Sequence, residues 1–131
     1  MKKLSILIIL FLFFLVACGN KFASISKRFE DEGYKYSERI SSTYSQIVAE
    51  YPEDVTVKPH VFTSGLKVAL ILEFTDIKKM AEAIEESPST MRLIEDLNRA
   101  ELINGNCLLI PFSITNEGIN EMINIFQGKT K

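Results

Sequence analysis

The chain has 131 residues, of which 47% are apolar and 24% charged, with 15 basic and 17 acidic side chains. This length is that of one modest domain, and an apolar fraction near one half excludes global disorder. The formal net charge of −2 shows no basic excess, so we expect no nucleic-acid partner.

The amino terminus has the pattern of a secretory signal. Lys2 and Lys3 precede an apolar run from Leu4 to Ala17, which only Ser5 interrupts. Basic residues before a short apolar run are typical of signal peptides. A transmembrane helix needs roughly 20 apolar residues, and this run is shorter. We therefore expect residues 1–17 to be a signal peptide that is removed.

The four residues Leu15-Val16-Ala17-Cys18 resemble the lipobox of bacterial lipoproteins. The resemblance implies that the Cys18 thiol receives a diacylglyceryl group and that a peptidase then cuts between Ala17 and Cys18. Two acyl chains anchor a protein stably, whereas one binds a membrane only marginally. We therefore expect residues 18–21 to be a lipidated tether. The lipid bilayer is then the partner of acylated Cys18, at the extracytoplasmic face of the cell membrane.

Residues 22–131 are expected to form a single α+β domain that opens with two helices. One apolar stripe of helical spacing runs from Phe22 to Gly33, and a second runs from Ile40 to Tyr51. Tyr34 and Tyr36 lie in the joint between these helices. Because protein-binding surfaces favour tyrosine, we expect these two side chains to form a contact patch for a partner.

Two strands follow. Apolar residues alternate with polar ones over 55–61 and again over 66–74, and Ser64-Gly65 marks a turn between the two segments. The second strand is apolar on one face and partly apolar on the other, so we expect it at the centre of a sheet.

Helix start signals come next. Thr75 or Asp76 can cap a helix over 77–84, and Ser87-Pro88 can begin another that continues to Leu97.

A second hairpin and a last helix complete the chain. Asn104-Gly105 between two apolar runs predicts a hairpin, and Pro111 indicates that the returning strand ends there or lies at an edge. Thr115 caps a final helix that ends at Gly128. The element order predicts an α+β fold, in which two β-hairpins form one antiparallel sheet with helices packed on one face.

Candidate chemical groups are few. The single histidine, His60, stands on the polar alternation of a strand, so we expect a surface histidine. Cys107 lies in an apolar stretch, so we expect a buried, inert thiol. The paired carboxylates do not converge, and no phosphate-binding loop or nucleophile motif is present. We therefore expect no metal, no cofactor and no enzymatic activity.

The layout as a whole resembles the small, mostly uncharacterised lipoproteins of low-GC Gram-positive bacteria. The resemblance rests on the lipobox, the early helix ending in Glu-Gly-Tyr, the strand over 66–74 that leads into the 77–84 helix, the Asn-Gly hairpin and the closing helix. Pro111-Phe112 departs from the polar residues that many members carry there. The resemblance assigns a role to one residue of this chain, which is lipid attachment at Cys18. The resemblance favours a host with a single membrane, although Gly19 after Cys18 suits outer-membrane sorting in a Gram-negative host.

These observations favour a non-enzymatic protein-binding module at the cell surface, with a membrane or envelope protein as its partner. One form of this function is an exclusion or immunity factor that blocks a conjugation or phage entry machine. The alternative is a small-ligand or lipid-binding lipoprotein, because the chain carries many large apolar residues for its length.

Overall fold

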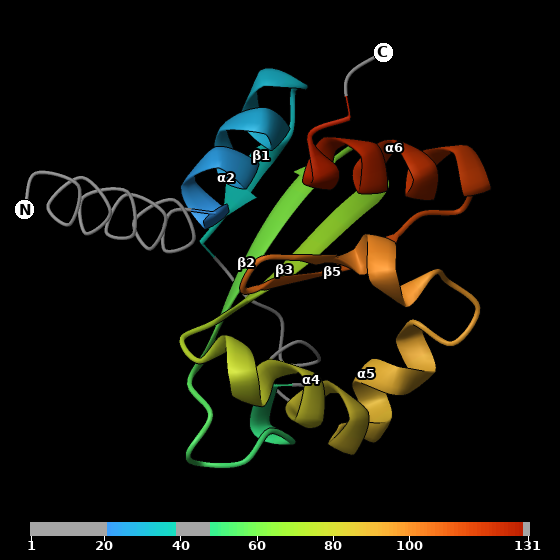
Figure 1. The fold of residues 1–131 in the computed structure, drawn as a ribbon. Coiled ribbons are helices and arrows are strands. Elements are labelled where there is room, and N and C mark those ends of the chain that lie inside the picture. Colours follow the sequence, from blue (N-terminus) through green and yellow to red (C-terminus); the bar gives the residue numbers. More distant parts are fainter. Residues whose placement is uncertain (1–20, 39–47, 130–131) are drawn as a thin grey trace, which may run out of the picture.

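A computed structural model describes residues 21–38 and 48–129 of the chain (Figure 1). The expected signal peptide, which ends at Ala17, lies outside the described residues. So do Cys18 with most of the expected tether, and most of the expected helix over 40–51.

The centre of the fold is a five-stranded antiparallel sheet in the order β1-β2-β3-β5-β4. Its strands are β1 (Lys35–Ser37), β2 (Val57–Ser64), β3 (Lys67–Phe74), β4 (Ile103–Asn104) and β5 (Cys107–Phe112). The predicted α+β class is confirmed, and so is the construction of the sheet from the two hairpins β2–β3 and β4–β5. Strand β3 is central, as its apolar sequence indicates. The short edge strand β1 has no counterpart in the sequence prediction.

Each hairpin has a two-residue loop that begins with glycine, namely Gly65-Leu66 and Gly105-Asn106. Both glycines have φ of +60°, a conformation that L side chains rarely adopt and that suits a II′-type loop. Both turns lie one residue later than predicted, because Ser64 pairs with Lys67 and Asn104 pairs with Cys107, so that both belong to the ladder.

The helices are α2 (Lys21–Asp31), α4 (Ile77–Glu86), α5 (Pro88–Leu93) and α6 (Asn116–Gln127), with a 3₁₀ turn η1 (Arg99–Leu102). Their starts follow the predicted caps. The side chains of Asp76, Ser87 and Thr115 accept hydrogen bonds from the backbone N–H groups of Lys78, Thr90 and Gly118. Helix α6 ends at Gly128 as predicted, whereas α5 ends at Leu93, before the predicted Leu97.

The helices cover both faces of the sheet, where the sequence predicted one. Helices α2 and α6 lie on one face, and α4 and α5 lie on the other (Figure 1). Ring contacts agree with this arrangement. Phe22 of α2 stacks on His60, while Tyr51 meets Phe74 from the opposite side. The reason lies in β3, whose residues Ala69–Leu72 are completely buried, so that both faces of the strand need cover.

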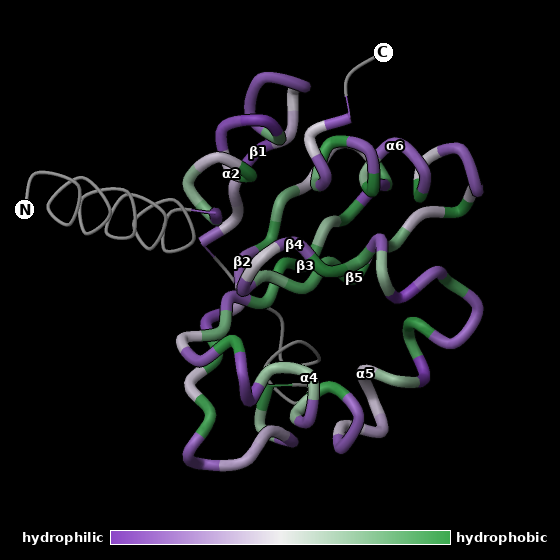
Figure 2. Tube along the Cα trace, in the orientation of Figure 1, coloured by the Kyte–Doolittle hydropathy of each residue, from purple (hydrophilic) through white to green (hydrophobic). Residues whose placement is uncertain are grey.

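The hydrophobic core therefore has two layers, one on each side of the sheet. Hydrophobic residues follow β3 and β5 through the middle of the molecule (Figure 2). On the α2–α6 side the fully buried side chains include Ile25, Phe29, Met122 and Phe126. This layer fixes α2 and α6 against the sheet, and these two helices carry the sites described next.

Candidate functional site

Helix α2 runs from one end of the sheet to the other. It begins beside the β4–β5 loop, so closely that a Cβ added to Gly105 would lie 2.7 Å from Cγ of Lys21. It ends at Asp31, which lines one groove together with Gly65 and Leu66 of the β2–β3 loop. We call the first region, formed by Lys21, Gly105 and Asn106, the closed end of the domain. The second region, formed by Gly65, Leu66 and Ile114, is the open end.

A buried polar network lies on the half of β2 and β3 nearer the closed end. His60 is 3% exposed, and Phe22 covers its ring at a centroid distance of 3.6 Å. The prediction of a surface histidine is therefore wrong. His60 does stand opposite the apolar positions of its strand. However, the face it points to is covered by α2, and β1 adds Tyr36 beside it.

The hydrogen bonds of this network define the state of His60. Its Nε2 lies 3.0 Å from Oε1 of Glu73, a carboxylate that can only accept, so Nε2 carries the proton. Its Nδ1, 3.0 Å from the Tyr36 hydroxyl, then accepts from that hydroxyl. Burial lowers the pKa of His60, and the opposing influence of Glu73 is smaller, so the ring is neutral near pH 7.

The network holds Tyr36 in place and does not expose a base. Both nitrogens of His60 are occupied and Phe22 lies over the ring, so an incoming molecule finds no free ring nitrogen. The Tyr36 side chain itself remains 43% exposed, because β1 is an edge strand of the sheet.

The two tyrosines of the predicted contact patch have different environments. Tyr34 is 3% exposed and packs edge-on against Phe29, and its hydroxyl donates to Oε2 of Glu121 at 3.1 Å. Burial, with the nearby charge of Glu121, raises the pKa of Tyr34 far above its usual value. Of the two side chains, only Tyr36 is available on the surface.

A groove of about 1090 Å³ lies at the open end, between α2 and α6. The β2–β3 loop and residues 113–115 close its outer side. Two apolar side chains stand at its rim, Leu66 at 75% exposure and Ile114 at 83%. Leu66 was predicted as the first residue of the strand over 66–74. The missed signal is its position directly after Gly65, which makes it the second residue of a two-residue loop.

Most of the basic groups in this groove are already engaged. Lys67 pairs with Glu121 at 2.5 Å. Arg28 donates from Nε and Nη2 to the carbonyl oxygens of Ile125 and Phe126, in the last turn of α6.

Three carboxylates that line the groove have no such partner. Asp31, Glu32 and Glu117 form no ion pair with a basic side chain of the described residues. With the Lys67–Glu121 pair set aside, these three carboxylates outnumber the two other cations that line the groove, Arg28 and Lys129, so its net charge is negative.

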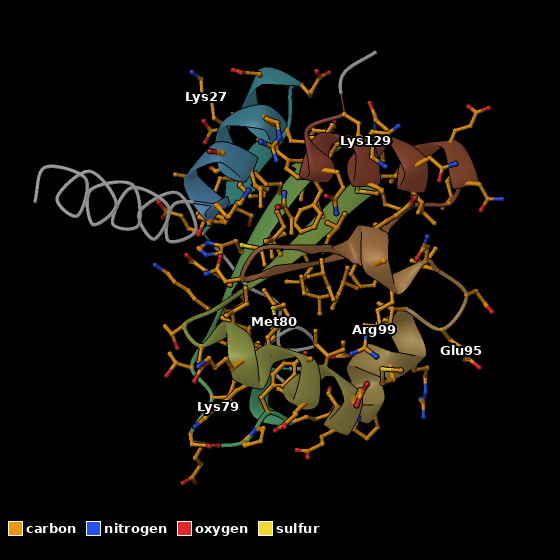
Figure 3. The ribbon with its side chains drawn as sticks, viewed as in Figure 1. Lys27, Lys79, Met80, Glu95, Arg99 and Lys129 are labelled. Carbon is orange, nitrogen blue, oxygen red and sulfur yellow. The ribbon has the colours of Figure 1, made fainter. Side chains whose placement is uncertain are left out.

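A smaller hollow of about 400 Å³ lies on the opposite face, beside α5 and η1. It is lined by Met91, Arg92, Ile94, Glu95, Leu97 and Arg99. Arg99 reaches from η1 toward α4, where its Nη1 donates to Glu85 at 3.2 Å (Figure 3). This hollow combines apolar and cationic walls.

The remaining candidates carry no site. Cys107 is completely buried, which confirms the predicted burial, and burial, with the charge of Glu73, raises the pKa of its thiol to about 12. Within residues 21–38 and 48–129, no three His, Cys, Asp or Glu side chains could hold a metal ion. Among the same residues, no helix has the length and apolar character to cross a membrane.

Comparison with known proteins adds no relative: no protein-family model, curated protein or solved structure matches the chain.

Proposed function

We propose that this protein is a membrane-anchored extracytoplasmic lipoprotein that acts as a non-enzymatic binding module and holds a protein partner at its open end. The apolar pair Leu66 and Ile114, exposed at the end of the sheet away from Lys21, is the observation that carries the proposal. The signal pattern and the Leu15–Cys18 resemblance to a lipobox supply the anchor.

The position of α2 gives this arrangement a direction. Lys21 is three residues after Cys18, and three residues reach at most ~10 Å. A lipid on Cys18 therefore keeps the closed end near the bilayer. Helix α2 has 11 residues, and at 1.5 Å per residue its far end lies about 16 Å from its start. The groove is then at a height where a membrane protein's loops can reach it.

The energy available at the open end suits protein binding. Burying one aliphatic side chain of this size contributes about 1.5–3 kcal/mol. Leu66 and Ile114 are mostly exposed in the described domain, so a partner that covers both gains most of that amount twice.

The anchor is tested by metabolic labelling with an alkyne fatty acid, followed by membrane fractionation. We expect the wild-type chain to carry the label and to sediment with membranes, and Cys18→Ala to lose both properties. Cys107→Ala is the matched control, since it removes the other cysteine and leaves the lipobox unchanged. Label retained on Cys18→Ala would contradict a lipid on this residue.

The partner is tested by in-cell photocrosslinking from the full lipoprotein, with the photoreactive residue at position 66 or 114. Position 77 is the control, because Ile77 is also an exposed aliphatic residue, on α4 at the opposite face. We expect the same membrane protein from positions 66 and 114 and none from position 77. Equal capture from all three positions would indicate chance encounters and argue against the open end.

Exclusion of a conjugation or phage entry machine is one form of this proposed function. A compact anchored domain with one binding face is sufficient for it. Conjugation and phage-infection frequencies are therefore measured in recipient cells that carry the wild-type gene, a Leu66→Asp variant or no gene. Equal frequencies in all three strains would eliminate this form and leave the binding module.

The alternative, a small-ligand or lipid-binding lipoprotein, has its best support in the hollow beside α5. Apolar walls from Met91, Ile94 and Leu97, together with Arg92, suit an amphipathic molecule with an anionic group, while Arg99 is already paired with Glu85. A native mass spectrum of the lipoprotein purified from its membrane tests this alternative. An adduct that Met91→Asp removes would favour it, and a spectrum without adducts would count against it.

A further inference from the structure

We propose that the partner inserts a basic segment with an apolar centre into the α2–α6 groove, its Lys or Arg side chains facing Asp31, Glu32 and Glu117. The inference rests on the proposed binding function and specifies the chemistry of the partner at the same site.

The end of α2 carries an unfavourable concentration of negative charge. The last residues of the helix and its exit are Glu30, Asp31 and Glu32. The carboxyl end of a helix carries a negative partial charge, so carboxylates there are unfavourable for the helix itself. One basic side chain, Arg28, stands in the last turn; it keeps its charge, but its guanidinium is directed to the carbonyl oxygens of α6, and its single charge faces three carboxylates. The helix thus carries an unfavourable feature that a cation from outside would relieve.

Carboxylates without an ion-pair partner line the groove itself. Lys67 is paired with Glu121, and the Nζ of Lys129 lies 4.0 Å from Glu101. The carboxylates of Asp31, Glu32 and Glu117 form no ion pair among the described residues, and they come from both walls of the groove, the end of α2 and the first turn of α6. A segment lying along the groove can meet all three.

The rim of the groove offers apolar contact to a partner. Leu66 and Ile114 provide apolar contact at the outer end of the same groove. A segment that binds there needs an aliphatic or aromatic side chain beside its basic ones. This combination selects a protein segment, because a simple cation would gain nothing from Leu66 and Ile114.

Two other occupants fit the same observations less well. A second copy of the chain joined by a two-fold axis would place the same acidic groove against itself, which like charges disfavour. An anionic lipid surface would meet a groove of its own sign. The outcomes of the experiment include both.

The experiment uses the full lipoprotein in nanodiscs of zwitterionic phosphatidylcholine and two fluorescent probe peptides. One has the sequence Lys-Arg-Leu-Ile-Lys-Arg, and the other has Glu and Asp in place of its basic residues. We expect the basic peptide to bind, with the methyl signals of Leu66 and Ile114 shifting in NMR spectra, and the acidic peptide to bind at least tenfold more weakly. Affinity for the basic peptide should fall as salt is added.

Charge reversal supplies the decisive comparison. The variant Asp31→Lys/Glu32→Lys should weaken binding of the basic peptide at least tenfold and reduce in-cell crosslinking from position 66 to the same extent. The matched control is Glu82→Lys/Glu86→Lys, which reverses two exposed carboxylates on α4, outside the groove. It should leave both readings unchanged.

The reversed variant should also fold, because lysine at the carboxyl end of α2 is favourable for that helix, and its Tm should not fall. Asp31→Asn/Glu32→Gln provides a second, neutral variant with an intermediate effect on peptide binding. If the lysine variant unfolds, the neutral variant is used in its place: weaker binding of the basic peptide would support the inference, and unchanged binding would overturn it.

The outcomes separate this inference from the proposed function. A membrane-protein crosslink at position 66 that charge reversal leaves unchanged would overturn the basic segment and keep the binding module. A wild-type chain without any crosslink from positions 66 and 114 would remove the binding module itself. Crosslinks only between copies of this chain, equal binding of the two peptides, or binding of bare anionic vesicles in place of the basic peptide would each overturn the inference.

Discussion

The two ends of the sheet are built from similar hairpins and finished in opposite ways. Both loops have two residues and begin with a glycine at φ +60°. At the closed end the loop lies against Lys21, and Asn106 donates its side-chain N–H to the Phe74 carbonyl at 2.8 Å. At the open end nothing lies within 4 Å of a Cβ added to Gly65, and the next residue is an exposed leucine. Two loops of the same geometry can therefore either pack against the domain or leave an apolar side chain exposed. The outcome depends on the side chain in the second loop position and on the residues around the loop.

The largest effect is expected for the network near the closed end. His60→Ala should lower the free energy of unfolding by about 3 kcal/mol, because it leaves a void under Phe22 and removes the hydrogen-bond partner of Tyr36 and Glu73. Urea denaturation followed by circular dichroism measures this. Lys58→Ala, an exposed position two residues earlier on β2, is the control and should change stability by less than about 0.5 kcal/mol. Similar losses in both variants would show that the network is not special.

The two loop glycines allow a direct comparison of the ends. Gly65→Ala should cost about 1 kcal/mol, since alanine is strained at positive φ. Gly105→Ala should cost about 1 kcal/mol more, because its Cβ would also collide with the stem of Lys21. Thermal and urea unfolding of the two variants check the difference. Equal destabilisation would mean that the contact with Lys21 does not hold the closed end.

A smaller effect is expected from pH. Burial holds the pKa of His60 below its ordinary value of 6.5, against the opposing influence of Glu73. Between these two pKa values the unfolded chain binds a proton that the folded chain does not. The stability present above pH 6.5 is therefore lost progressively as pH falls through this window.

Urea midpoints measured between pH 7.5 and 5 test this dependence. Because His60 is the only histidine in the chain, His60→Gln should flatten the profile above the range in which carboxylates titrate. An unchanged profile in this variant would assign the dependence to other groups.

The smallest effect on stability is expected at the open end. Leu66→Ser should change the free energy of unfolding by less than about 0.5 kcal/mol, since the side chain is 75% exposed and packs little in the described domain. The same variant should reduce crosslinking to the partner severalfold when the probe is at position 114. A loss of stability above about 1 kcal/mol would show that Leu66 serves the fold, and the comparison between the ends would fail.

Features that depend on neighbours in the sequence were predictable. Asp76, Ser87 and Thr115 cap helices through hydrogen bonds that span only two or three residues, so the sequence contains the whole interaction. The central position of β3 was also readable from its apolar residues. The same observation implies cover on both of its faces, which is the step that the prediction of a one-sided helical layer omitted.

Features that depend on distant segments were not predictable in this way. The burial of His60 requires Phe22 from α2 and Tyr36 from β1, and each is more than twenty residues away. The groove requires α2 and α6, which lie at opposite ends of the described chain. Tyr34 and Tyr36 are only two residues apart, yet contact with α2 and α6 buries one, and the edge position of β1 exposes the other.

The burial of Cys107 has a practical consequence for counting acylated molecules. The chain has two cysteines, and burial both shields the Cys107 thiol and raises its pKa to about 12, so that it stays protonated at neutral pH. A maleimide applied to the native protein thus reports on Cys18 alone. After denaturation, Cys107 reacts as well and serves as an internal standard of one thiol per chain. For the proposed lipoprotein, the first reading divided by the difference between the second and the first gives the fraction of molecules without lipid, and no radiolabel or antibody is needed.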